Sequence, residues 1–154
     1  MTLEAPLIEV ETLNEPQIVQ LWELSRREWW SANRSLEETR RIVAGTTLNF
    51  GVLDKADEKL VGYSRVISDG ISKALILDVI VADTHRGLRL GERLMERILT
   101  HKALCDVQHF ELYCLPALIP FYERWGFTAA LGEMRFMRLT VKNQDSRRGP
   151  CPTT

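Results

Sequence analysis

The chain has 154 residues, of which 45% are hydrophobic and 27% are charged, a composition typical of a globular domain with a full core. The formal net charge of −1 argues against a protein that works by coating nucleic acid or an anionic membrane. Three cysteines without metal-ligand spacing indicate reduced thiols in a cytoplasmic protein, and the first residues carry no export signal. The apolar runs are too short to cross a membrane.

The first part of the chain predicts a short strand and two helices. Leu7–Val10 is apolar enough for the strand. Asn14 can cap a helix over residues 15–28, which has a proline in its first turn and apolar residues at helical spacing. Ser35 is followed three positions later by a glutamate, a capping box that predicts a second helix over residues 36–44.

Two adjacent tryptophans, Trp29 and Trp30, separate these helices. Neighbouring side chains on a helix point about 100° apart, so both cannot enter one core from a helix. One tryptophan is therefore expected to line a surface groove or a pocket. The alternative is that both pack beneath the loop, because aromatic side chains dominate cores generally.

The hydrophobic period then changes from helical to alternating. Residues 48–67 predict a β-hairpin with a polar connection at 54–58. A second turn, at 68–70, leads into the apolar strand Leu75–Val81. Three consecutive strands joined by short turns are antiparallel to one another.

The second half of the chain predicts a crossover to a further strand. The helix 87–99 begins with Gly87, Gly91 and two arginines in its first turn and carries an apolar stripe. It leads to a strand over 108–114 that is parallel to Leu75–Val81. A short helix over 116–125 follows, and a strand over 134–139 closes the sheet.

The predicted element order is thus β-α-α-β-β-β-α-β-α-β. This order describes a single α/β (α+β) domain with a mixed sheet over residues 1–140. The polar composition of residues 141–154 predicts a disordered C-terminal tail.

The junction between the strand Leu75–Val81 and the following helix predicts a phosphate site. A strand that feeds a helix N-terminus directs free backbone N–H groups and the positive end of the helix dipole at one point. The glycines of Arg86–Gly91 are four apart and no Gly-Lys-Ser/Thr follows, so the run is neither a dinucleotide fingerprint nor a P-loop. No serine elbow, no HExxH motif and no cysteine pair is present, so neither a Ser-His-Asp site nor a metal is expected.

The run Arg86-Gly87-Leu88-Arg89-Leu90-Gly91 resembles the Gln/Arg-x-x-Gly-x-Gly/Ala signature of the GNAT superfamily of acyl-CoA-dependent N-acyltransferases. The block Phe121–Phe127, FYERWGF, resembles the second hallmark of that family. The element order over residues 10–139 is similar as well. The resemblance implies a GNAT-like mixed sheet whose fourth and fifth strands splay apart, with acetyl-CoA as co-substrate.

The resemblance also implies where coenzyme A would bind. The pantetheine arm is expected to pair with the fourth strand, since it has two amides and the splay leaves backbone groups unpaired. The residues implied for the arm are Val79, Ile80 and Val81. The residues implied for the pyrophosphate, through their N–H groups, are Arg86, Gly87, Leu88, Arg89, Leu90, Gly91 and Glu92.

Arg89 departs from the family signature, because it stands where the family has its first glycine. Only the N–H is needed at this position, so an ordinary helical φ is expected to tolerate the side chain. The guanidinium would then point away from the diphosphate, bind one of its oxygens or bind the 3′-phosphate of the cofactor. A solvated helix arginine is the alternative.

The reaction implied by the resemblance needs a proton donor, an oxyanion donor and a neutral amine. Tyr122 is implied as the acid that protonates the leaving sulfur, the alternative being a tyrosine that only packs in its helix. The oxyanion donor would be a backbone N–H near Val79 or Ile80. Asp78 lies in an apolar strand, where a carboxylate is either structurally paired or poised in the acceptor cleft as the base.

Competitors for the role of base are Glu111, His109 and a chain of water molecules.

The leading hypothesis is an N-acetyltransferase that moves an acetyl group from acetyl-CoA to an amine of a small molecule or protein by direct attack. The resemblance places the acceptor pocket between the first helices and the sheet, where Trp29 and Trp30 would suit an apolar, aromatic or cationic amine. The alternative hypothesis is a non-catalytic acyl-CoA-binding or regulatory module. The arginine clusters indicate solvated faces rather than a nucleic-acid surface. The sequence does not decide between a monomer and a homodimer.

Overall fold

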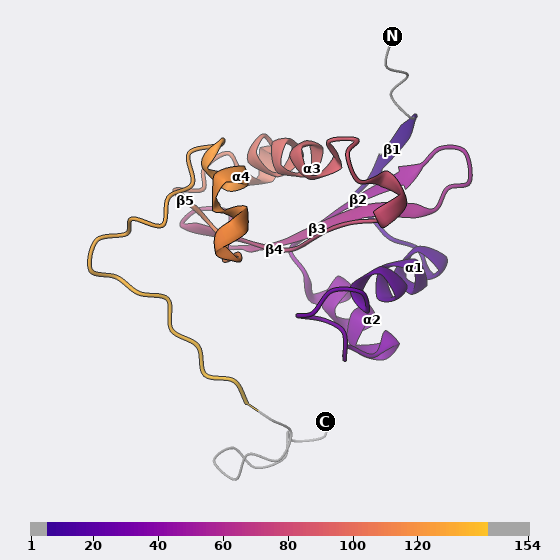
Figure 1. Ribbon diagram of the computed structural model, residues 1–154, viewed down its shortest axis with the longest axis horizontal. Coiled ribbons are helices and arrows are strands. Elements are labelled where there is room, and N and C mark those ends of the chain that lie inside the picture. The colour runs from indigo at the N-terminus through magenta and orange to yellow at the C-terminus, as the bar shows by residue number, and fades with distance from the viewer. Residues whose placement is uncertain (1–5, 142–154) are drawn as a thin grey trace. The chain divides into compact units, whose positions relative to one another are not determined.

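The computed structural model describes residues 6–141 of the chain (Figure 1). Within that range, no helix is long and apolar enough to cross a membrane. The chain forms two compact units, the first ending at Tyr113 and the second beginning at Cys114. The helices and strands are β1 (Leu7–Val10), α1 (Glu15–Ser25), α2 (Leu36–Gly45), β2 (Leu48–Asp54), β3 (Leu60–Ser68), β4 (Lys73–Val81), α3 (Leu90–Leu99), β5 (His109–Glu111) and α4 (Ile119–Glu123). The 3₁₀ turns are η1 (Asp83–His85), η2 (Lys102–Leu104) and η3 (Pro116–Leu118).

The first unit is built on one five-stranded sheet with the strand order β1-β2-β3-β4-β5. The pairs β1–β2, β2–β3 and β3–β4 are antiparallel, and the short turns that join β2 to β3 and β3 to β4 require this of the last two pairs. The last pair, β4 and β5, is parallel and is joined through α3. The predicted class, a mixed α/β sheet, is confirmed.

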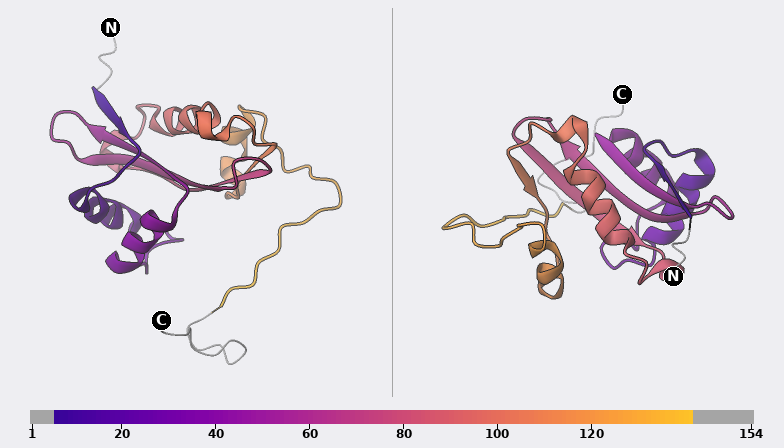
Figure 2. Two further views of the ribbon diagram at one scale, coloured as in Figure 1. Left: turned by 180° about the vertical axis from the view of Figure 1, so that it is seen from behind. Right: turned by 90° about the horizontal axis from the view of Figure 1, so that it is seen from above.

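Helices cover both faces of this sheet, with α3 on one face and α1 and α2 on the other (Figures 1 and 2). The predicted alternation in β2 is confirmed on the α3 side, where Phe50 and Val52 are fully buried. Val52 lies beside Gly62, whose missing Cβ would also approach Leu90 and Leu94 of α3. Alternation therefore supplies the two apolar layers that a sheet covered on both faces requires.

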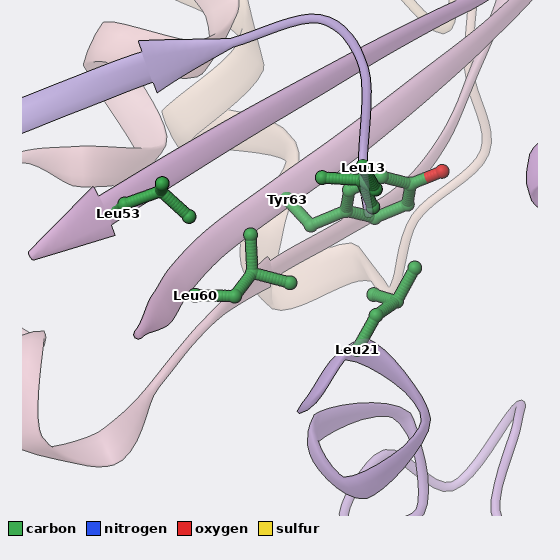
Figure 3. Packing of buried hydrophobic residues seen from close by; sticks show 5 residues of the cluster. All are labelled: Leu13, Leu21, Leu53, Leu60 and Tyr63. Carbon is green, nitrogen blue, oxygen red and sulfur yellow. The ribbon is translucent and has the colours of Figure 1, made fainter. Parts of the chain in front are cut away.

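The opposite face packs against α1 through a cluster of large apolar side chains. Figure 3 shows its five buried members, which come from β2, β3, α1 and the segment before α1. They are Leu13, Leu21, Leu53, Leu60 and Tyr63. Burial of each such side chain is worth about 1.5–3 kcal/mol, so this cluster fixes α1 against the sheet.

Both predicted helix starts are confirmed by their caps. The Asn14 side chain accepts a hydrogen bond from the Gln17 backbone at 3.0 Å, and Ser35 and Glu38 cap each other's backbone. However, α1 ends at Ser25 rather than near residue 28. The Ser25 hydroxyl donates to the Trp22 carbonyl, and the chain after it continues as i→i−3 turns. Such local side-chain bonds compete with helix propagation.

Several predictions in the second half differ from the structure: the strand predicted over 108–114 is only β5, His109–Glu111, and the helix predicted over 116–125 is divided into η3 and α4. The helix α3 begins at Leu90, so Gly87 lies in the turn before it and not in its first turn. Residues 134–139 form no strand. In an alternating pattern, Arg135 and Arg138 would point to opposite faces of such a strand, so neither face would be fully apolar. A strand also needs a neighbouring strand for its hydrogen bonds, which the local pattern does not provide. Most of the predicted tail, residues 142–154, lies outside the described range.

Candidate functional site

The strand β4 contains a bulge near its middle. Tyr63 of β3 pairs with Ile80, but Arg65 pairs with Leu77, so β4 carries an extra residue over this step. Asp78 occupies the bulge with a φ of 52°. A left-handed backbone is uncommon for a residue other than glycine, and bulges redirect the side chains beside them.

Beyond this bulge, β4 has no ladder with β5. The parallel pairing runs from Lys73↔His109 to Leu75↔Glu111, whereas β4 continues to Val81. The predicted parting of the fourth and fifth strands is therefore present. Val79, Ile80 and Val81 lie in the part of β4 that, within the described chain, forms no ladder on its β5 side. Such an edge can accept hydrogen bonds from an amide-containing ligand.

The strand leads into a turn whose backbone suits an anion. Gly87 has a φ of 84°, and Arg89 has a φ of 59° as the N-cap of α3. The first hydrogen bond at this end of the helix runs from the Arg93 N–H to the Arg89 carbonyl. The N–H groups of Leu90 and Gly91 precede it and have no acceptor within the helix. The positive end of the helix dipole lies at the same place.

The backbone of Arg89 corrects one expectation. Its φ is left-handed, not helical, so the position retains the conformation that suits a glycine. A side chain in this conformation costs roughly 1–2 kcal/mol. The Arg89 guanidinium donates to Glu92 at 2.6 Å and is 79% exposed. The side chain is thus held over the first turn of α3.

An ion pair and two histidine contacts also hold the turn in place. Arg86 pairs with Asp83 at 3.0 Å, within the same turn. His85 contacts Asp54, at the end of β2, at 2.8 Å, and its other ring nitrogen lies 2.8 Å from the Thr84 hydroxyl. The pKa of Asp54 is lowered, chiefly by a backbone hydrogen bond and also by His85. These contacts anchor the turn to the hairpin.

The carboxylate of Asp78 is almost fully buried and has three partners. Its Oδ2 atom accepts hydrogen bonds from Arg65 at 2.7 Å and from Arg34 at 3.1 Å, and Oδ1 accepts one from the Trp30 indole at 3.2 Å. Burial raises the pKa of Asp78, but the bonds and charges of Arg65 and Arg34 outweigh it and hold the pKa below its ordinary value. Of the two expectations for this residue, the contacts are those of structural pairing.

Next to this ion-pair network is a surface hollow of about 630 Å³, here named the tryptophan hollow. It is formed by the loop after α1 and by one side of α2. Its lining residues are Trp29, Trp30, Ser31, Ala32, Asn33, Arg34, Glu38, Arg41 and Ile42. The two tryptophan rings meet edge to face at 5.8 Å and are 70% and 42% exposed. Both tryptophans therefore line a pocket, as was expected of one.

The second unit carries Tyr122 on the short helix α4. Its ring is buried and packs edge to face with Phe121, at 4.9 Å, and with Phe127, at 6.1 Å. Burial, with a smaller contribution from Cys114, raises the pKa of Tyr122 to about 12. The phenol therefore keeps its proton at neutral pH and can donate it. Gly126, with a φ of 90°, lies in the turn that follows α4, although α4 itself ends at Glu123 and not at residue 125 as predicted.

The two competing bases lie on β5, in the first unit. Glu111 forms an ion pair with Lys73 of β4. His109 is exposed and pairs through its backbone with Lys73. Both side chains are exposed, so neither has the buried setting of a base enclosed in an active site.

Three arginines around Asp78 and the tryptophan hollow were not predicted. Arg65 belongs to the alternating pattern of β3, but its contact with Asp78 depends on a bulge for which the sequence gives no local signal. Arg34 belongs to an irregular loop that no hydrophobic period describes. Arg41 could have been placed on the side of α2 that carries Glu38, since residues three apart are neighbours on a helix.

The chain was compared with protein families, curated proteins and solved structures. The model of the acetyltransferase (GNAT) domain matches residues 48–129. A crystal structure assigned to the GNAT acetyltransferases, from Xanthomonas campestris pv. campestris, is similar at a TM-score of 0.75 and 27% identity, over 88% of this chain and 94% of that one.

Two curated relatives carry acetyltransferase names. An uncharacterized ycf52-like N-acetyltransferase of Prochlorococcus marinus is 27% identical over 122 residues, which cover 78% of this chain and 66% of the relative. The chloroplastic serotonin N-acetyltransferase 2 of Oryza sativa subsp. japonica is 33% identical over 89 residues, covering 56% of this chain and 44% of the relative. The chain thus spans less than two thirds of the length of either relative.

Proposed function

Because the chain belongs to the GNAT family of acetyltransferases, we propose that it transfers an acetyl group from acetyl-CoA to an amine. The observation that carries the proposal is the continuity between the end of β4, which forms no ladder on its β5 side, and the turn before α3. One stretch of backbone thereby offers strand-like hydrogen bonds and, next to them, a helix N-terminus. A long cofactor with two amides and a pyrophosphate requires this combination.

Coenzyme A fits these residues in two parts. The pantetheine arm would pair with β4 at Val79, Ile80 and Val81. The pyrophosphate would lie against the backbone N–H groups of the turn and of the start of α3, including those of Leu90 and Gly91. The full set proposed for the pyrophosphate is Arg86, Gly87, Leu88, Arg89, Leu90, Gly91 and Glu92.

The chemistry follows from direct attack. The neutral amine nitrogen forms a bond to the carbonyl carbon of the thioester. The carbonyl oxygen becomes negatively charged and accepts a hydrogen bond from a backbone N–H near Val79 or Ile80. The C–S bond then breaks, and Tyr122 donates its proton to the departing thiolate. The ammonium nitrogen of the tetrahedral intermediate loses its proton to water, which leaves the neutral amide, and the Tyr122 phenolate regains a proton from solvent.

Asp78 has a different part in this proposal from that of a base. Two arginines stabilise its charged form, so it accepts a proton only weakly. It instead holds Trp30 and Arg34 against β4, immediately before Val79. We assign Asp78 the role of a positioning residue between the acyl site and the tryptophan hollow.

The tryptophan hollow is the proposed acceptor site. Its two exposed indoles offer a surface on which an apolar or aromatic amine can bury area. The relative from Oryza sativa is named for serotonin, which is an aromatic amine. An aromatic primary amine is accordingly the first acceptor to examine.

The test is release of free CoA from acetyl-CoA in the presence of a panel of amines, with the Tyr122→Phe variant alongside. Amine-dependent release that falls by at least about tenfold in the variant supports catalysis with Tyr122 as acid. A second candidate function, an acyl-CoA-binding module without turnover, is favoured by the strained Arg89 backbone and by the pairing of Asp78. Binding of acetyl-CoA without amine-dependent release would establish that second function instead.

A further inference from the structure

The ion-pair network beside the tryptophan hollow has unequal charges. Two guanidiniums, those of Arg34 and Arg65, share the one carboxylate of Asp78, and both are mostly buried. Across residues 6–141, no second carboxylate forms an ion pair with either arginine. The network therefore has a formal charge of +1, and Arg34 brings that charge to the wall of the hollow.

A second guanidinium in the same wall forms no ion pair within the described part of the chain. Arg41 is exposed, and the described part of the chain provides it with no ion pair or hydrogen bond. The carboxylate of the hollow, Glu38, is engaged at 2.7 Å with the Ser35 N–H as part of the helix cap. The preceding arginine differs, because Arg40 pairs with Glu15 and Glu37 and does not line the hollow.

We propose that the tryptophan hollow recognises amines that carry a carboxylate, the aromatic amino acids being the class that fits. The aromatic body would lie against Trp29 and Trp30, and the carboxylate would be held by Arg41 and Arg34. Guanidiniums bind carboxylates through two parallel hydrogen bonds, which adds orientation to charge. The guanidiniums of Arg34 and Arg41 outnumber the single carboxylate of Glu38 in this lining and disfavour polyamines, whose additional ammonium groups they repel. This inference rests on the proposed function, since it names the acceptor class of that site.

The test uses pairs of compounds that differ only in the carboxylate. These are phenylalanine with phenethylamine, tyrosine with tyramine, and tryptophan with tryptamine. For each compound, kcat/KM is measured with acetyl-CoA, and direct binding is measured by calorimetry without acetyl-CoA. We expect kcat/KM and affinity to be about three- to tenfold higher for the carboxylated member of each pair. This is the range for one partly exposed charge-assisted contact.

Two neighbouring variants separate recognition from general charge. Arg41→Gln is expected to remove most of that preference by lowering kcat/KM and binding for the carboxylated members of the pairs. Arg40→Gln removes the same charge one position away and is expected to leave the preference intact. Circular dichroism of both variants checks that α2 remains folded.

The outcomes distinguish this inference from the proposed function. Carboxylate preference in binding that depends on Arg41, without turnover, would support the inference and contradict the proposed catalysis. Turnover with equal or better use of the uncarboxylated amines would overturn the inference and leave the catalysis standing. Equal effects of Arg40→Gln and Arg41→Gln would also overturn it.

Discussion

The Asp78 carboxylate and the Arg34 guanidinium, 44 residues apart in sequence, lie 3.1 Å from each other. This bond joins the bulge of β4 to the loop that carries both tryptophans. Trp30 reinforces the connection through its indole N–H. A disturbance at Asp78 should therefore affect both the stability of the first unit and the shape of the tryptophan hollow.

Replacement of Asp78 by Asn is expected to lower the free energy of unfolding by about 3 kcal/mol at neutral pH, because it leaves two buried guanidiniums without a counter-charge. The effect should depend on pH. The folded pKa of Asp78 is depressed, so its contribution is complete above the unfolded pKa near 4 and is lost as the pH falls through the lower folded pKa. Urea unfolding between pH 7 and pH 2 measures it.

The control for Asp78→Asn is Asp106→Asn, the same change at an exposed position. This control should match the parent protein at every pH. If the difference between Asp78→Asn and the parent stayed constant down to the lowest pH, the ion pairs would not be its source.

Arg89 allows a test of backbone strain without loss of a core contact. Both Arg89→Gly and Arg89→Ala remove the bond to Glu92, but only glycine relieves the φ of 59°. Arg89→Gly is expected to be more stable than Arg89→Ala by about 1 kcal/mol. Thermal unfolding of the two variants at one pH provides the comparison, and a more stable alanine variant would contradict the left-handed assignment.

Local sequence signals were sufficient for much of the fold. Asn14 and Ser35 marked both helix starts, and alternation around Phe50 marked the hairpin, because caps and period-two burial are short-range features. The bulge at Asp78 is different, since it arises from the register between β3 and β4. That register depends on the packing of the whole sheet, which no local window contains.

The candidate site was predictable to a similar extent. The glycines and arginines of residues 86–91 predicted the position of the turn before α3, but the left-handed φ of Arg89 did not follow from residue type, which disfavours it. The partners of Asp78 and the wall formed by Arg41 come from segments distant in sequence. Contacts of this kind require the tertiary structure.

Tyr122 leads to a prediction about pH. Its pKa is raised to about 12, so the phenol remains protonated from pH 7 to pH 10. If Tyr122 is the acid, the ratio of kcat between the parent and Tyr122→Phe should stay constant over that range, at about tenfold or more. Tyr113→Phe, which removes an exposed phenol, should leave kcat unchanged. A ratio that fell toward one near pH 10 would show that Tyr122 ionises there and would exclude a pKa near 12.

The central claim, that the turn before α3 and the end of β4 hold coenzyme A, is tested most directly by calorimetric titration with acetyl-CoA. A paired substitution sharpens the titration, because an added Cβ meets nothing within 4 Å at Gly87 or at Gly45, and only Gly87 has a positive φ. We expect saturable binding of one acetyl-CoA per chain, weakened about fivefold by Gly87→Ala and unchanged by Gly45→Ala. The absence of binding at millimolar acetyl-CoA would contradict the account.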